Sequence, residues 1–384
     1  MRKALTTILL LLGMSACICE AAPKHKPQIS QDQENADFRQ LFASVFYQWD
    51  SNHDGVLDLK ELNEAVENPN TRGNDAAIAV VLHRHLQIDD EARTNALTFE
   101  EAMSLAADPA IQKNISGKAW HIVGIDHVLF APGDPNLETF HQGGIGDCYL
   151  LAVIGTFVFH HSETIRTMIK EQNDNSYKIQ FGNGKEVMVS PVTDSELIMG
   201  ASEGHNHGVW LSVLEKAYAQ IALEAKERKT GEDISYDDGV PTDYIGHGGY
   251  YSPVIALLTG HKSSGVSFRR WLQQDPQNGM ERAHEMLTKL STGHKLMATM
   301  VSENGTLPKG LIHGHVYGVL QYDPATRVVT VFNPWGNHFK PAGPPGLVYG
   351  YPTGHGIFEV PLEEFVHVFG GTAYETDQPV PASR

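Results

Sequence analysis

The chain is poor in cysteine and in positive charge. Only three cysteines, Cys17, Cys19 and Cys148, occur among 384 residues. If an N-terminal signal is removed near Ala22, one thiol remains and no internal disulfide can form. The 29 lysines and arginines are outnumbered by 46 aspartates and glutamates, which gives a formal net charge of −17 at pH 7. That charge disfavours nucleic acid and anionic membrane surfaces as partners.

The chain also lacks a long hydrophobic run. Its main apolar stretch, residues 4–16, follows Arg2 and Lys3 and is too short for a comfortable membrane span. This pattern predicts an export signal over residues 1–22 and no transmembrane helix in the mature chain. Residues 14–17 form an imperfect lipobox, so a lipid anchor at Cys17 is the alternative to cleavage near Ala22. We therefore expect a periplasmic, outer-membrane-associated or secreted protein.

The composition and the hydrophobic pattern of the sequence change twice after the signal. Residues 23–37 are polar, with almost nothing to bury, and predict a flexible linker. An acidic helical segment covers about residues 38–110. Beyond Gly124 the pattern turns to short strands, glycine turns and a few long helices. These changes predict an α+β protein with an all-α N-terminal module.

Residues 50–61 match a calcium-binding loop between two helices. Gly55 lies at position 6, where the chain must turn sharply, and Glu61 at position 12 can bind a cation through both oxygens. Apolar residues line one face of the preceding helix and of the following one. The predicted Ca²⁺ ligands are Asp50, Asn52, Asp54, the backbone carbonyl of Val56, Asp58 and Glu61.

A second, weaker helix–loop–helix follows. If Glu101 takes position 12, Asp90 takes position 1, but Ala92 and Thr94 fall where ligands are needed. Too few oxygens remain for tight binding, so we expect a metal-free structural partner of the first loop. Together the two copies resemble an EF-hand pair over residues 38–110.

Cys148 lies where a glycine-rich turn, residues 143–146, meets an apolar helical segment. The backbone N–H groups of a helix start favour a thiolate and lower the thiol pKa. Gln142, six residues earlier, can donate a hydrogen bond to an oxyanion. The helix after Cys148 is apolar nearly all round and should be central and buried.

The strand pattern that begins at His315 and the one that ends near Asn333 predict a hairpin around residues 323–326. With an odd number of loop residues, 322 pairs with 326, and His315 lies opposite Asn333 on one face. An even number would separate the two residues onto opposite faces. On one face, the asparagine would fix the tautomer and orientation of the imidazole.

Other histidines have simpler interpretations. His313 is an alternative base, two residues from His315 on the same strand. His205 and His207 have metal-compatible spacing, but no third ligand is evident, which favours a surface loop. His83 and His85 lie in the acidic helical segment and are expected to be solvated.

Three of these motifs resemble the calpain family of papain-like cysteine proteases. Residues 142–151 resemble its nucleophile motif, residues 314–319 its histidine motif and residues 333–336 its asparagine motif. Further matches cover residues 210–219, 248–260 and 356–365. The resemblance extends over residues 120–377 in the family's order. A preceding EF-hand pair and an export signal look like a bacterial architecture.

The resemblance implies a papain-like two-lobed protease core. It assigns Cys148 as nucleophile, His315 as base and acid, and Asn333 as the orienting residue. Gln142 would serve the oxyanion hole and Trp335 would shield the His–Asn hydrogen bond. The expected function is an exported, calcium-binding endopeptidase acting on proteins or peptides. The alternatives are a papain-like acyltransferase or amidase, and a non-catalytic calcium-binding interaction protein with an inactive protease fold.

Overall fold

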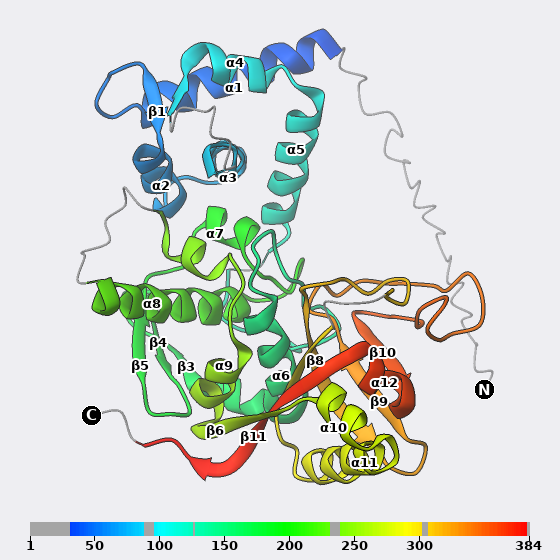
Figure 1. Ribbon diagram of the computed structural model, residues 1–384. Helices are drawn as coiled ribbons and strands as arrows, with labels where there is room; N and C mark the ends of the chain where they lie inside the picture. Colours follow the sequence, from blue (N-terminus) through cyan, green and yellow to red (C-terminus); the bar gives the residue numbers. More distant parts are fainter. Residues whose placement is uncertain (1–30, 88–95, 126, 231–238, 302–305, 382–384) are drawn as a thin grey trace, which may run out of the picture.

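The computed structural model describes residues 31–87, 96–125, 127–230, 239–301 and 306–381. The predicted signal peptide, Cys17 and residues 90–95 of the second loop lie outside these ranges. The described chain forms three parts, of which the first lies above the other two and these lie side by side (Figure 1). They are an N-terminal part (residues 31–123), a helical part (124–260) and a sheet part (261–381). Helices and antiparallel sheets are segregated, so the protein mixes α and β structure as the sequence predicts.

The N-terminal part consists of helices joined by one small sheet. Strand β1 pairs antiparallel with β2, with Leu57 opposite Leu97. Asp58 and Glu61 form a capping box at the start of α2, and Thr98 and Glu101 form another at the start of α4. The elements are α1 (Gln31–Trp49), β1 (Val56–Asp58), α2 (Leu59–Glu67), α3 (Asn74–Gln87), β2 (Ala96–Thr98), α4 (Phe99–Ala106) and α5 (Pro109–Val123).

Four sequence-based expectations for this part differ from the structure. Helix α1 begins at Gln31, inside the predicted linker, since residues 31–37 are mostly good helix formers. His83 is buried rather than solvated, and its Nε2 lies 2.8 Å from Asn63 Oδ1. The boundary expected between residues 110 and 120 falls inside α5. The short strands also mean that the module is not purely helical.

The helical part is organised around α6, which is buried along most of its first half. A small sheet of three strands in the order β3-β4-β5 covers one end of this part. The elements are α6 (Cys148–Met168), β3 (Ile169–Glu171), β4 (Tyr177–Gln180), β5 (Glu186–Val189), α7 (Asp194–Met199), α8 (Trp210–Thr230), the 3₁₀-helix η1 (Pro241–Ile245) and α9 (Tyr251–Thr259).

The sheet part contains six antiparallel strands in the order β10-β9-β8-β7-β11-β6. Helix α6 lies close against this sheet, since a Cβ at Gly318 would come within 2.8 Å of the Ala152 carbonyl oxygen. The elements are β6 (His261–Val266), α10 (Phe268–Gln274), α11 (Pro276–Thr292), β7 (Met297–Val301), β8 (Val316–Asp323), β9 (Val328–Phe332), β10 (Ile357–Pro361), α12 (Leu362–Val368) and β11 (Phe369–Pro379).

The β8–β9 hairpin differs from the predicted register. Asp323 pairs with Val328, so four residues form the loop, the even number expected to separate His315 from Asn333. The pairing changes between Val319 and Gln321, where a bulge leaves Leu320 as the extra residue. Side chains alternate between the two faces of a strand, so one extra residue in β8 moves His315 back to the face that the even loop would have denied it. Extending the Gly318–Phe332 register therefore puts His315 and Asn333 on the same face of the hairpin.

Candidate active site

Cys148 is the first residue of α6, at the end of a closely packed glycine turn. The Gly144 N–H donates to the Met199 carbonyl at 2.8 Å, and the Gly146 N–H donates to the Gly246 carbonyl at 2.9 Å. A Cβ at Gly143 would approach the Gly200 carbonyl oxygen to 1.9 Å. The turn therefore needs glycine because neighbouring backbone leaves no space for a side chain, and this packing fixes the helix start.

The Cys148 thiol is 8% exposed. Burial raises its pKa, while the backbone N–H groups of Val316, Tyr149 and Cys148 itself lower it. Burial dominates, so the pKa is raised, opposite to the expectation from the helix start alone. The Val316 contact also places the thiol close to His315, because Val316 follows His315 directly and begins β8.

His315 is 5% exposed, and its Nε2 lies 2.7 Å from Asn333 Oδ1. The Asn333 amide is held in this orientation from both ends. Its Nδ2 donates to Asn337 Oδ1 at 2.9 Å, and its Oδ1 accepts from the Trp335 N–H at 3.1 Å. Since Asn333 Oδ1 can only accept, His315 Nε2 carries the hydrogen and Nδ1 keeps the free lone pair. Burial lowers the pKa of His315, whereas the Asn333 contact raises it.

Two aromatic rings enclose the His315 imidazole. The Tyr317 ring lies edge-on at a centroid distance of 4.8 Å, and the Trp335 ring lies tilted at 4.8 Å. Trp335 is 42% exposed, so it covers the His315–Asn333 pair from the solvent side. His313, the alternative base, is exposed. The geometry therefore favours His315 over His313.

Gln142 connects the glycine turn to the asparagine segment. Its backbone N–H donates to the Pro334 carbonyl at 2.8 Å, and its side-chain Nε2 donates to the Ile145 carbonyl at 2.8 Å. The amide nitrogen carries two hydrogens, so one of them remains for another acceptor.

A buried pair of carboxyl groups behind the nucleophile is a feature that the sequence does not reveal. Asp147 and Glu215 are 0% and 2% exposed, and each carboxyl group acts on the pKa of the other. Burial raises the pKa of Asp147 to about 7 and raises the pKa of Glu215 well above its ordinary value. The Ala201 N–H also donates to the Glu215 carboxyl group. Both residues occur in the motifs quoted above, but their distance in sequence hides the pairing.

This pair predicts a specific pH dependence of stability. Because folding raises the pKa of Asp147 from about 3.8 to about 7, its contribution is complete below about pH 4. The contribution is lost as the pH rises to about 7, at about 1.4 kcal/mol per pH unit. Glu215→Gln keeps the side-chain size and removes one carboxyl group. We expect its free energy of unfolding to rise relative to the wild type between about pH 5 and pH 7. Urea unfolding at several pH values measures this difference, and parallel profiles would contradict a coupling between the two carboxyl groups.

In the predicted calcium loop, side-chain oxygens accept hydrogen bonds from backbone N–H groups of the same loop. Asp50 and Glu61 are 5% and 4% exposed, although both carry carboxylates. Asp50 Oδ1 accepts from the Asp54 N–H at 3.1 Å, and Glu61 Oε1 accepts from the Ser51 N–H at 2.9 Å. Gly55 has a φ of 85°, as the sharp turn requires. This set of oxygen donors fits a hard cation such as Ca²⁺.

A second cluster of titratable side chains contains residues that are distant in the sequence. Asp134, Glu203 and His207 bring their ligand atoms within 4.8 Å of one another, and in the described chain only these three do so. His207 Nδ1 lies 2.6 Å from Asp134 Oδ1, so the surface-loop interpretation of His207 is wrong. The Gly208 N–H donates to Asp134, and the Trp210 indole donates to Glu203. Burial raises the pKa of Glu203 to about 8, so this carboxyl group holds a proton at neutral pH.

A buried thiol at a helix start, next to a histidine oriented by an asparagine, is the arrangement of a thiol-dependent hydrolase. The family model for calpain family cysteine proteases matches residues 101–344, more than half of the chain. The chain therefore belongs to the calpain family of cysteine proteases.

Relatives share modest identity with the chain. Calpain-9 of Rattus norvegicus is 26% identical over 231 residues, which cover 55% of this chain and 30% of that protein. The calpain-type cysteine protease DEK1 of Arabidopsis thaliana is 27% identical over 229 residues, 55% of this chain and 10% of that protein. The chain thus spans less than a third of the length of these relatives. None of the helices in the described ranges combines the length and apolar character of a membrane span.

Proposed function

We propose that the protein is a calpain-type cysteine endopeptidase. Cys148 is the nucleophile, His315 the base and acid, and Asn333 the orienting residue of a papain-like two-lobed core. The observation that carries this proposal is the 2.7 Å contact between His315 Nε2 and Asn333 Oδ1. It leaves Nδ1 free, and His315 adjoins Val316, whose N–H contacts the thiol.

The reaction begins with transfer of the Cys148 proton to His315 Nδ1. Burial disfavours each charge alone, so the thiolate and imidazolium form together and stabilise each other. The sulfur attacks the peptide carbonyl carbon, and the carbonyl π electrons move to oxygen. His315 then protonates the leaving amine as the C–N bond breaks, giving a thioester. Water, deprotonated by His315, adds to the thioester, and the acid product leaves as Cys148 regains its proton.

The oxyanion is stabilised by the Cys148 backbone N–H and the Gln142 side chain. One Gln142 N–H holds the Ile145 carbonyl, and the second would donate to the oxyanion once substrate is bound. This division of labour keeps the glutamine in place before substrate arrives. Trp335 covers the His315–Asn333 hydrogen bond, which is strongest where water is excluded.

We also propose that residues 38–110 form an EF-hand pair whose first loop binds Ca²⁺. Strand β1 of the first loop pairs with strand β2 of the second. This pairing would let the second loop hold the first in place. Ca²⁺ would be held by Asp50, Asn52, Asp54, the Val56 carbonyl, Asp58 and Glu61, and it would neutralise their negative charge.

The proposed location is outside the cytoplasm of a bacterium, after export by the signal in residues 1–22, with a lipid anchor at Cys17 as the alternative. The weakest extracellular EF-type sites bind calcium with a Kd of about 10⁻⁴–10⁻³ M. Calcium outside the cytoplasm fills such a site permanently. The ion then stabilises the folded protein instead of acting as a signalling switch.

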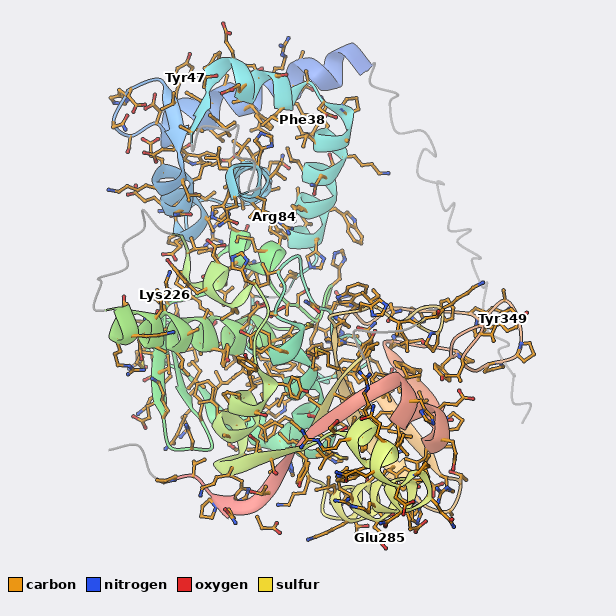
Figure 2. All side chains as sticks on the ribbon, in the orientation of Figure 1. Phe38, Tyr47, Arg84, Lys226, Glu285 and Tyr349 are labelled. Atoms are coloured by element: carbon orange, nitrogen blue, oxygen red, sulfur yellow. The ribbon has the colours of Figure 1, made fainter. Side chains whose placement is uncertain are left out.

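Arg84 supports a connection between this module and catalysis. It extends from α3 towards the helical part (Figure 2), and its guanidinium donates to the Gly144 carbonyl in the turn before Cys148. Next to it, His83 Nε2 lies 3.5 Å from Asp243 Oδ2 of η1. The N-terminal part therefore holds the turn that positions the nucleophile.

The proposed activity is tested with denatured protein substrate and an epoxysuccinyl inhibitor. We expect new peptide termini by mass spectrometry and covalent labelling of Cys148, with neither in Cys148→Ser. Labelling with acyl transfer or side-chain deamidation, but no chain cleavage, would support the acyltransferase or amidase instead. Absence of labelling in the folded wild-type protein would favour an inactive protease fold with a binding role.

A further inference from the structure

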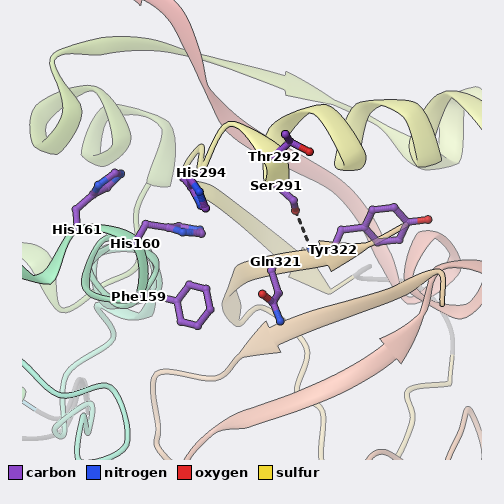
Figure 3. Close-up of a pocket in the computed structure, with 8 residues that line it drawn as sticks. All are labelled: Phe159, His160, His161, Ser291, Thr292, His294, Gln321 and Tyr322. Carbon is purple, nitrogen blue, oxygen red and sulfur yellow. Dashed lines mark hydrogen bonds between the residues drawn. The ribbon is translucent and has the colours of Figure 1, made fainter. Parts of the chain in front are cut away.

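A cleft with three histidines lies far from the thiol. It has a volume of about 720 Å³ and is lined by α6, the end of α11 and β8 (Figure 3). His160 and His161 come from α6, and His294 follows α11. His160 is twelve residues beyond Cys148 along α6, about 18 Å at 1.5 Å per residue. We call this the histidine cleft, and the proposed protease reaction leaves it without a role.

His160 presents an unused lone pair. Its Nε2 is buried without a hydrogen-bond partner, and a backbone contact with Leu320 occupies the other ring nitrogen. Burial, with His161 and His294 nearby, lowers the pKa of His160 to about 4, so the ring is neutral at physiological pH. A histidine that donates one N–H to backbone and keeps the other nitrogen free has the arrangement of a metal ligand.

His294 faces His160 across the cleft. Figure 3 shows the two rings pointing toward one another, and their centroids are 5.3 Å apart at an interplanar angle of 57°. Two imidazoles on one tetrahedral metal, with metal–nitrogen distances of about 2.0–2.1 Å, have centroids about 5 Å apart. The spacing of these two rings is therefore compatible with shared coordination, although the ligand atoms of the three histidines do not lie within 4.8 Å of one another.

The position of the His161 ring and the backbone conformation at His161 and His294 are also compatible with metal coordination. The His161 ring lies 6.0 Å from that of His160, and His161 breaks the helical geometry of α6 with φ −140° and ψ 38°. His294 has a φ of 50°, a conformation that non-glycine residues rarely adopt. Unusual backbone at two of three neighbouring histidines is typical of sites where side-chain direction matters.

The electrostatic surroundings favour a cation. Helix α11 ends at Thr292, so its last carbonyls, the negative end of the helix dipole, are near His294. Glu375 of β11 acts on His160 as a negative charge. The titratable groups that act on His160 are thus two further imidazoles and Glu375, whose carboxylate is itself paired with His261 and Lys295.

We propose that the histidine cleft binds a transition-metal ion of the zinc type through His160 Nε2 and His294, with His161 turning inward as a third ligand. Imidazole is a preferred ligand of such ions. Because His160 belongs to the helical part and His294 to the sheet part, the ion would tie the two parts together on the side of α6 remote from Cys148.

Zinc titration of the untagged full-length Cys17→Ser/Cys19→Ser/Cys148→Ala protein, with calcium saturating, tests this proposal without interference from any thiol. We expect one bound zinc, and Co²⁺ should give the visible absorption of tetrahedral nitrogen coordination. His160→Gln/His294→Gln should weaken zinc binding by at least about 10-fold and remove the zinc-dependent rise in Tm. The exposed His294→Gln single variant provides the same test if the double variant does not fold.

Two matched controls locate the ion. His338→Gln/His355→Gln removes another close ring pair, with centroids 4.5 Å apart, and His207→Gln disrupts the Asp134–Glu203–His207 cluster. Both controls should bind zinc like the parent. Binding that survives His160→Gln/His294→Gln, or that is lost in either control instead, would overturn the proposal, as would a parent protein that binds no zinc.

Discussion

Replacing Cys148 with alanine is expected to lower kcat/KM for peptide hydrolysis by at least about 10³-fold. The thiol supplies the bond to the acyl group, and none of the site's other side chains can take over that bond. The variant should still fold, because alanine at the start of α6 leaves the buried helix and its glycine turn unchanged. Initial rates on a fluorogenic peptide, together with cleavage products of a denatured protein, measure the effect.

Graded variants of the same site separate the roles. His315→Gln removes the base and should cost about 10²–10⁴-fold in kcat/KM. Asn333→Ala leaves base and nucleophile in place but releases the imidazole, so its loss should be smaller than that of His315→Gln. Rates in Cys148→Ala that equal those of the wild type would refute the assignment of the nucleophile.

Calcium is expected to raise the thermal stability of the wild type and not of Glu61→Gln. With a Kd of about 10⁻⁴–10⁻³ M and 10 mM calcium, binding adds about 1.4–2.7 kcal/mol to the free energy of unfolding. Glu61 is 4% exposed, and its replacement removes the bidentate ligand of the first loop. Scanning calorimetry in calcium and in chelator measures the increment as a change in Tm.

Glu101→Gln is the matched control. Glu101 occupies the same capping-box position in α4 that Glu61 occupies in α2, and glutamine can keep the cap in both variants, so the two substitutions have matched effects on their helices. Only the first loop has the ligands for calcium, so Glu101→Gln should keep the calcium-dependent rise in Tm. A wild-type Tm that does not respond to chelator would contradict the proposed calcium site.

The residues of the candidate site could be selected from the sequence because each has a local signature. A cysteine after a glycine turn and a histidine at the start of a strand can both be recognised from a few neighbouring residues. The hairpin register was harder, since the bulge at Leu320 depends on how β8 packs and not on the loop sequence. The sequence left an odd and an even loop open; the loop is even, and the common face of His315 and Asn333 arises because the bulge compensates for it.

What the sequence could not reveal depends on contacts between distant residues. Asp147 and Glu215 are separated by a long stretch of chain, and so are Asp134 and His207. Periodicity records which face of an element is buried but not which element buries it. For the same reason His83 looked like a surface residue of an acidic helix, although a second helix and η1 enclose it.

The shared core beneath the N-terminal helices bears on how this protease could be shortened. Ile198, Met199 and Val240 pack in the same hydrophobic cluster as the apolar residues of α1–α5. Cutting the chain after α5 and removing those helices would uncover these three side chains and release the Gly144 carbonyl from Arg84. An exposed apolar patch of that kind promotes aggregation. The N-terminal helices are thus an inseparable scaffold of the enzyme, unlike a propeptide that activation discards.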